Sequence, residues 1–286
     1  MEIRKICVLG TGTIGYQIAH QAAIKGYKVC LRDIDDGLLK NAEEKIKKET
    51  QKFFVDKGKL TQEEGNAVIE RLSFTSDLKE AVTGADVVIE SIFEDMELKK
   101  RVFKELDEIC APSTIIGSNT SSLSITEIGS LAKRQDRIIG IHFSNPVTVM
   151  KLCEIILGAN TSDETLDIAR DLAIKMGKEP VIVKDSPGFI TTRLFVTLVN
   201  EAAKIVYEGI AGPADIDRAL ELALGHPMGP LKTADMNIEI AYKCLKYFRE
   251  EFGDEYRPCP IFKKMINAGH LGVKSGRGFY EYRKSA

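Results

Sequence analysis

The sequence predicts an α/β protein in which a doubly wound, largely parallel sheet carries an inserted helical hairpin and is followed by a small all-α C-terminal domain. Short apolar runs alternate with amphipathic helical segments up to about residue 183, which is typical of open parallel sheets. A glycine-rich turn joins the first apolar run to the first helical segment, and beyond residues 184–188 the pattern is helical almost throughout. We therefore expect one domain over residues 1–185 and a second over residues 186–286.

The glycine-rich turn Gly10-Thr-Gly-Thr-Ile-Gly15 follows the apolar run 6–9 directly and opens the helical segment 14–25. A strand, G-x-G-x-x-G and a helix in this order are typical of a Rossmann-type dinucleotide site. Gly10 permits the tight turn, Gly12 lets the backbone approach a pyrophosphate, and Gly15 lets helix and strand pack closely. The helix N-terminus presents unpaired N–H groups to the phosphates. The cofactor contacts expected here are Gly10, Gly12, Thr13, Ile14 and Gly15.

A second strand, residues 27–31, leads to Asp33, eighteen residues beyond Gly15. A carboxylate at this place accepts hydrogen bonds from the ribose hydroxyls and repels a 2′-phosphate, so the sequence favours NAD over NADP. Arg32 weakens this preference, because its guanidinium could reach a phosphate.

The polar stretch 37–71 is too long for a simple crossover helix, so we expect two helices that meet near residues 56–58. Its lysines, Lys52 and Lys59 among them, are usual on a solvated helix face. They also fit a basic rim for a phosphate-bearing substrate, and both interpretations stay open on the residues alone.

The α/β alternation then resumes. Strands are expected at 85–90, 114–118, 137–143, 152–156, 180–183 and 279–282, and helices at 94–110, from 124, 162–176, 190–208, 213–224, 234–251 and 261–268.

Composition argues against several classes of partner. The net charge of −2 provides no electrostatic attraction for nucleic acid or an anionic membrane, and no apolar stretch approaches the roughly 20 residues of a membrane span. The six cysteines show no C-x-x-C or metal-ligand spacing, so we expect no metal. The N-terminus enters a strand within a few residues, which leaves no room for a signal peptide, and a cytoplasmic location is expected.

Several polar residues fall at the carboxyl ends of the expected strands, where ligands bind in such sheets. They are Asn119, Ser121, His142, Asn145 and Glu154. Histidine suits a general base near neutral pH, and a carboxylate on its far nitrogen would fix the tautomer. His142 with Glu154 could therefore take the hydroxyl proton during alcohol oxidation while Ser121 holds the substrate oxygen. A structural histidine in a plain salt bridge is the competing interpretation.

Seven strings along the chain, in order, resemble the L-3-hydroxyacyl-CoA dehydrogenases, and the short-chain bacterial 3-hydroxybutyryl-CoA dehydrogenases most closely. They are residues 10–15, 118–122, 141–146, 150–154, 185–189, 226–230 and 272–276. The resemblance implies a Rossmann domain followed by a helical dimerisation domain, a homodimer, and NAD-linked interconversion of (S)-3-hydroxyacyl-CoA and 3-oxoacyl-CoA.

The resemblance also implies roles for single residues. His142 matches the catalytic base, Glu154 its orienting carboxylate, and Ser121 the serine that contacts substrate and nicotinamide. Lys59 matches a lysine that meets the CoA phosphates, which favours the basic-rim interpretation, and Lys52 is placed with it on the substrate side. The cofactor contacts outside the glycine turn are Asp33, Glu94, Lys99, Asn119, Asn145 and Lys274.

Three departures from the family pattern fall on the substrate side. Thr192 stands where the family has an asparagine that binds the reacting oxygen, and Ser144 replaces an aromatic residue. The string 235–240 lacks the usual glycine and second aspartate. We therefore expect an acyl substrate or an efficiency that differs from the family norm. Ordinary 3-hydroxybutyryl-CoA kinetics, with no gain from Thr192→Asn, would contradict this.

Two alternatives remain at this point. The chain could oxidise a hydroxy acid that carries no CoA, such as a sugar acid or carnitine, and competition by free CoA would discriminate. It could instead be a dinucleotide-binding protein with weakened catalysis. Retention of Ser121, His142 and Glu154 argues against that, because a binding protein has no need of a base.

Overall fold

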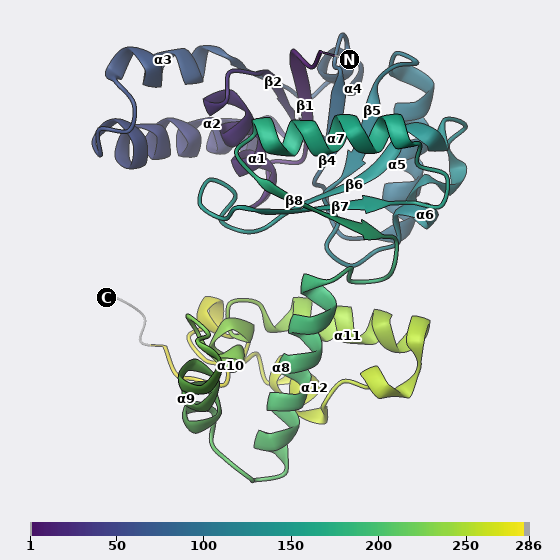
Figure 1. Ribbon diagram of the computed structural model, residues 1–286. Coiled ribbons are helices and arrows are strands. Elements are labelled where there is room, and N and C mark those ends of the chain that lie inside the picture. The colour runs from purple at the N-terminus through teal and green to yellow at the C-terminus, as the bar shows by residue number, and fades with distance from the viewer. Residues whose placement is uncertain (1, 283–286) are drawn as a thin grey trace. The chain divides into compact units, whose positions relative to one another are not determined.

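The computed structural model describes residues 2–282, which form two compact units (Figure 1). The first ends at Ser186 and the second begins at Pro187, one residue beyond the boundary expected from the sequence. Each unit is described by itself.

The first unit contains an eight-stranded sheet of order β3-β2-β1-β4-β5-β6-β7-β8. All neighbouring strands are parallel except β6 and β7, which are antiparallel. The predicted largely parallel, doubly wound sheet is therefore confirmed. The strands are β1 (Lys5–Leu9), β2 (Lys28–Arg32), β3 (Leu72–Thr75), β4 (Val87–Glu90), β5 (Ile115–Ser118), β6 (Ile138–Phe143), β7 (Leu152–Leu157) and β8 (Glu179–Lys184).

Helices cover this sheet, and their buried faces complete its core. Residues Ile6 and Val8 of β1 share one hydrophobic cluster with α1 and α7, while α5 packs against β5 and α6 against β6. Figure 1 shows α7 lying in front of the sheet. The helices of this unit are α1 (Gly15–Ile24), α2 (Asp36–Thr50), α3 (Gln62–Glu70), α4 (Leu78–Val82), α5 (Met96–Ile109), α6 (Ile125–Ile128) and α7 (Asp163–Lys175).

The expected helical hairpin is formed by α2 and α3, which project beside the sheet in Figure 1. A π-helical turn, Gln51–Val55, extends α2. The Thr61 hydroxyl and the Glu64 carboxylate form a reciprocal capping box that starts α3. The hairpin packs on α1, so its base is tied to the nucleotide-binding fold.

Several elements differ from the sequence expectation. The edge strand β3 and the short helix α4 were not predicted, because Leu72-Ser-Phe-Thr75 is only half-buried and gives no continuous apolar run. The strand expected at 279–282 is wrong: within residues 2–282 this region forms only isolated bridges, from Arg277 to Gly272 and to Glu281.

The second unit is helical, with α8 packed against α10, α11 and α12 around one hydrophobic cluster. Gly188 lies just before α8 with φ 76°, and a β-carbon there would collide with the Phe248 ring, so the start of this unit requires glycine. The helices are α8 (Thr191–Tyr207), α9 (Pro213–Leu224), α10 (Pro230–Ala234), α11 (Ile238–Phe252) and α12 (Pro260–Asn267).

A buried histidine joins α1 to the hairpin. His20 is fully buried, and its Nε2 lies 2.8 Å from the Thr50 hydroxyl, which itself donates to the Ile46 carbonyl. Nε2 must therefore carry the proton. Nδ1 has no hydrogen-bond partner among the described residues and lies 3.8 Å from a Glu49 oxygen. Burial lowers the pKa of His20 to about 4 despite this carboxylate.

This histidine should make the fold sensitive to mild acid. Between about pH 6.5 and pH 4 the unfolded chain binds a proton that folded His20 does not, so stability falls as pH falls through that window. We expect wild type to lose about 2 kcal/mol more unfolding free energy than His20→Gln between pH 7 and pH 5. Urea unfolding at both pH values measures the difference. Equal losses in the two proteins would show that His20 does not titrate in this way.

Candidate functional site

The glycine-rich turn follows β1 at the carboxyl edge of the sheet. Gly10 has φ 98°, and a β-carbon there would collide with the Ser91 carbonyl. A β-carbon on Gly15 would collide with the Gly10 carbonyl, whereas one on Gly12 would meet nothing within 4 Å. The protein itself requires the first and third glycines. The second faces open space, which fits the close approach of a pyrophosphate.

Asp33 lies beside this turn, just after β2. Its carboxylate accepts hydrogen bonds from the Thr11 N–H (2.7 Å), the Thr11 hydroxyl (2.6 Å) and the Ile34 N–H (2.8 Å). These bonds fix the carboxylate where a ribose contact is expected, and that contact stays a prediction. Arg32 donates to the Ser76 carbonyl (3.2 Å), which holds its guanidinium toward β3.

His142 and Glu154 are directly opposed across the antiparallel pair β6 and β7. His142 Nδ1 lies 2.8 Å from Glu154 Oε2, and the side chains are 13% and 1% exposed. A carboxylate can only accept here, so Nδ1 carries the proton and the basic lone pair is on Nε2. This is the base-plus-carboxylate geometry expected from the sequence. The pair His20 and Glu49, at 3.8 Å, lacks such a hydrogen bond.

The loop after β5 brings the polar residues 119–122 to the same edge. The Asn119 side-chain oxygen Oδ1 accepts from the Phe143 N–H (2.9 Å), next to His142, and the side-chain Nδ2 donates to the Ser91 hydroxyl (3.3 Å). The Ser121 N–H donates to Glu94 (3.2 Å), and the Ser121 side chain is half-buried. The loop is thus anchored on both sides, toward β6 and toward β4.

Two further residues hold this edge together and were missed from the sequence. Gln17 of α1 donates to the Thr13 carbonyl (2.6 Å) and to Asn145 (3.2 Å), and it accepts from the Val147 N–H (2.8 Å). Lys178, also buried, donates to the carbonyls of Val147 and Met150 in the loop between β6 and β7. The sequence signal that could have identified Gln17 as a structural residue of the site is its polar side chain on the apolar face of α1.

Lys99, expected to contact the cofactor, is 1% exposed and lies between Glu90 (2.5 Å) and Glu94 (3.2 Å). Burial alone would lower its pKa, but the two carboxylates outweigh that effect and raise the pKa above its usual value. Lys99 is therefore a charged ammonium enclosed by acids. Its direct contact with the cofactor stays a prediction.

Two of the other expected contacts lie in the second unit. Thr192 is in the first turn of α8, and Lys274 forms an ion pair with Glu239. Asp235, from the unusual string 235–240, is fully buried and accepts from the N–H groups of Phe279 and Tyr280. Asp235 is thus a scaffold residue of this unit, while the substrate and cofactor roles of Thr192 and Lys274 stay predictions.

The hairpin lysines lie over aromatic rings. The Nζ atoms of Lys52 and Lys57 are 5.3 and 5.4 Å from the centroid of the exposed Phe53 ring, and Lys59 Nζ is 5.4 Å from that of Phe54. Such cation–π contacts restrain side chains that would otherwise be free. Three ammonium groups are therefore gathered around the π-helical turn of the insertion.

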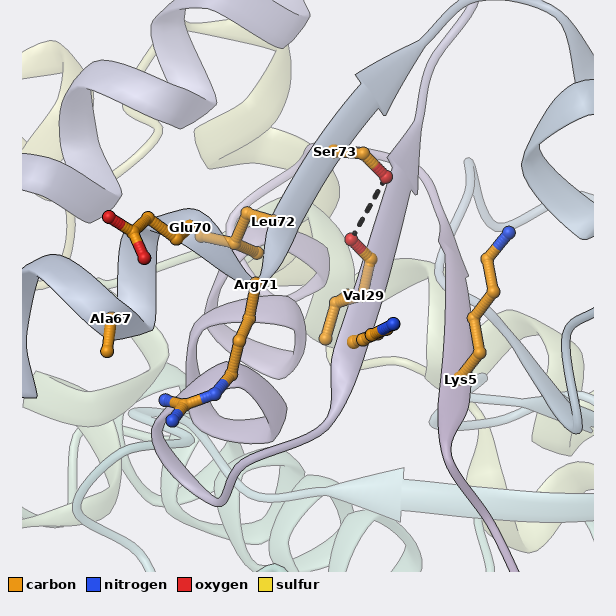
Figure 2. A pocket seen from close by; sticks show the side chains of 8 residues that line it. Lys5, Val29, Ala67, Glu70, Arg71, Leu72 and Ser73 are labelled. Atoms are coloured by element: carbon orange, nitrogen blue, oxygen red, sulfur yellow. Dashed lines mark hydrogen bonds between the residues drawn. The ribbon is translucent and has the colours of Figure 1, made fainter.

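A cavity of about 540 Å³ lies at the opposite edge of the sheet (Figure 2). It is formed at the amino ends of β1, β2 and β3, and its lining includes Lys5 of β1 and Arg71 at the end of α3. Beside them the Ser73 hydroxyl donates to the Val29 carbonyl (3.3 Å). Because ligands of such sheets bind at the carboxyl ends of the strands, we do not assign the dinucleotide to this cavity.

Within residues 2–282 no group of three or more His, Cys, Asp or Glu side chains is arranged to hold a metal ion. No helix in this range is both long and apolar enough to cross a membrane.

Comparison with known proteins identifies the family. Residues 5–186 match the NAD-binding domain of 3-hydroxyacyl-CoA dehydrogenase, and residues 188–282 match its C-terminal domain. The chain is 46% identical to a probable 3-hydroxybutyryl-CoA dehydrogenase of Bacillus subtilis, covering 99% of both chains. It is 40% identical to the 3-hydroxybutyryl-CoA dehydrogenase of Clostridioides difficile, covering 98% of this chain and 100% of that one.

A solved structure agrees with this assignment. The (S)-3-hydroxybutyryl-CoA dehydrogenase of Ralstonia eutropha matches with a TM-score of 0.94 and 37% identity, over 99% of this chain and 100% of that chain. With both domains present in order, the chain belongs to the 3-hydroxyacyl-CoA dehydrogenase family and is an NAD-dependent oxidoreductase of that type.

Proposed function

We propose that this protein interconverts (S)-3-hydroxyacyl-CoA and 3-oxoacyl-CoA, with short-chain substrates such as 3-hydroxybutyryl-CoA. The observation that carries the proposal is the hydrogen-bonded pair of His142 and Glu154 at the sheet edge that also bears the glycine-rich turn. Identity of 40–46% to relatives named as 3-hydroxybutyryl-CoA dehydrogenases supports the short-chain substrate.

The pair acts on the proton of the reacting hydroxyl. In oxidation, His142 Nε2 takes that proton, while Nδ1–H donates to Glu154, keeps the tautomer and stabilises the imidazolium. NAD⁺ held at the glycine-rich turn and Asp33 would supply the hydride acceptor for the carbon that bears this hydroxyl, so that the alcohol would become a ketone and NAD⁺ would become NADH. The Ser121 hydroxyl holds the substrate oxygen. In reduction, His142 returns the proton to that oxygen.

The hairpin lysines supply the specificity for CoA in this proposal. Lys52 and Lys59 carry the positive charges that CoA phosphates would meet, and the aromatic contacts reduce the entropy lost when these side chains bind. These contacts favour a basic rim for phosphates over a solvated helix face, because the ammonium groups converge on one turn.

Loss of NADH absorbance with acetoacetyl-CoA tests the function. We expect turnover by wild type, inhibition by free CoA, and a KM raised on the order of 10-fold in Lys59→Ala, since a phosphate loses a charged partner. Lys47→Ala is the matched control, because Lys47 is on the same hairpin but forms an ion pair with Glu43. No inhibition by free CoA, with equal KM values in both variants, would favour a substrate without CoA.

We also propose a homodimer and a cytoplasmic location. The second unit exposes large apolar side chains, which mark protein–protein interfaces when they gather on one surface; they are Leu194, Tyr207, Ile210, Leu222 and Leu224. Sedimentation at twice the 31.7 kDa chain mass would support the dimer. All six cysteines are free thiols and buried, which suits a reducing compartment.

A further inference from the structure

A buried acid ends β4, behind the loop that carries Ser121. Glu90 is fully buried, and its carboxylate accepts three hydrogen bonds. Oε1 accepts from the Ile92 N–H (2.8 Å) and Lys99 Nζ (2.5 Å), and Oε2 accepts from the Ser118 hydroxyl (2.6 Å). Glu90 thereby joins the end of β4, helix α5 and the end of β5.

Lys99 extends this network to Glu94. Lys99 Nζ lies 3.2 Å from Glu94 Oε2, and Glu94 Oε1 accepts hydrogen bonds from three groups of one loop. These donors are the Thr120 hydroxyl (2.5 Å), the Ser121 N–H (3.2 Å) and the Ser122 hydroxyl (3.1 Å). The charged chain Glu90–Lys99–Glu94 therefore ends on the backbone of Ser121.

A second route runs from Glu90 to the same loop through neutral groups. The Ser118 hydroxyl that donates to Glu90 accepts from the Thr120 N–H (3.2 Å), and the Asn119 N–H donates to the Glu90 carbonyl (2.7 Å). Both routes leave Glu90 and meet at residues 119–122, the segment that presents the Ser121 hydroxyl.

Stability alone is a poor reason for this arrangement. Taking the Glu90 carboxylate and the Lys99 ammonium out of water carries a large desolvation penalty, and apolar residues of similar size are often at least as stable. A fully hydrogen-bonded charged network does, however, allow one geometry only. The arrangement is better explained by a need to hold the loop in a single position.

We propose that Glu90 is a positioning residue for Ser121: through Lys99 and Ser118 it fixes Glu94 and the 119–122 loop, and so sets the place of the hydroxyl that holds the substrate oxygen. This inference rests on the proposed function of Ser121. Glu90 itself touches neither substrate nor cofactor in this role.

The test compares Glu90→Gln in two backgrounds with acetoacetyl-CoA and NADH. In the wild-type background we expect kcat to fall about 10- to 100-fold, which is the loss typical of a misplaced catalytic group. The NADH Kd should change less than about 3-fold. In a Ser121→Ala background the same change should lower kcat less than about 2-fold, because the hydroxyl to be positioned is absent. Full loss of kcat in both backgrounds, or no loss in either, would overturn the proposal.

A matched control separates positioning from general destabilisation. Asp107 lies on α5, its side chain is 5% exposed, and it pairs with Arg134 (2.8 Å) at the end of the helix away from the loop. Asp107→Asn should weaken the fold and leave kcat near the wild-type value. If Glu90→Gln does not fold, Glu90→Gln/Lys99→Met removes both opposite charges together, and the same comparison with Ser121→Ala is made with it.

Amide hydrogen exchange gives a readout that does not depend on turnover. The Ser121 N–H is bonded to Glu94, so Glu90→Gln should speed exchange at residues 120–122 by about 10-fold or more, with β7 unchanged as the internal reference. Unchanged exchange in the loop would overturn the proposal even if wild type failed to turn over acetoacetyl-CoA. If wild type fails to turn over acetoacetyl-CoA but loop exchange is faster in Glu90→Gln, the proposed substrate is contradicted and the positioning role of Glu90 stands.

Discussion

Replacement of His142 by alanine is expected to lower kcat for NADH oxidation by acetoacetyl-CoA about 10²- to 10⁴-fold, the usual contribution of a general acid–base group. The NADH Kd should stay near that of wild type, because the glycine-rich turn and Asp33 are untouched. Loss of NADH absorbance measures kcat, and NADH fluorescence measures binding.

The chain contains its own control for this experiment. His20 also lies near a glutamate, but its Nδ1 is 3.8 Å from Glu49 and its Nε2 is bonded to Thr50 inside the hairpin base. His20→Gln should therefore leave kcat near the wild-type value. The kcat of Glu154→Gln should lie between those of His142→Ala and His20→Gln. His142 remains in this variant, but glutamine fixes its tautomer and stabilises its imidazolium form less well than glutamate does.

The outcome also tests whether the pair of His142 and Glu154 is catalytic. A wild-type rate in His142→Ala would mean that the pair with Glu154 is a structural salt bridge, and the catalytic assignment would have to be abandoned. A large loss of kcat in His142→Ala but not in His20→Gln would assign the role of general base to His142.

The sheet could be predicted from sequence mainly where its strands are buried on both faces. Ile6–Leu9 and Val87–Ile89 are continuous apolar runs, because helices cover both sides of a parallel sheet. The edge strand β3 gave no such signal, since Leu72–Thr75 is only half-buried.

The direction of β7 could not be read from a local pattern. Its apolar run is the same whether it is parallel or antiparallel to β6. Only the antiparallel register, however, sets Glu154 directly opposite His142. The sequence therefore pointed to these two side chains, while their mutual geometry depended on a long-range pairing that no local spacing encodes.

Buried charge was the other feature that sequence reasoning could not reach. Glutamates and lysines are almost never fully buried unless they are paired, so a single sequence favours exposure at each position. Glu90 and Lys99 can be buried because they form an ion pair with each other. Lys178 can be buried because it donates hydrogen bonds to two carbonyls of a loop distant in the sequence. Such partners become visible only when the chain has folded.

The glycine-rich turn leads to the second large effect. Gly12→Val is expected to raise the NADH Kd about 100-fold or more, equivalent to about 2.7 kcal/mol, and to change the unfolding free energy by less than about 1 kcal/mol. A β-carbon at Gly12 meets no protein atom within 4 Å, so the valine side chain extends into the open space where the pyrophosphate is expected to approach. NADH fluorescence titration and urea unfolding measure the two quantities.

The neighbouring glycines should behave in the opposite way. In Gly15→Ala the added methyl group collides with the Gly10 carbonyl, so helix α1 must shift from β1, and the unfolding free energy should fall by several times the change in Gly12→Val. Gly212→Val, at an open position before α9, is the control for adding the same side chain elsewhere. Normal NADH binding by Gly12→Val would mean that the dinucleotide does not approach this turn, and the cofactor site would then have to be sought elsewhere along the carboxyl edge of the sheet.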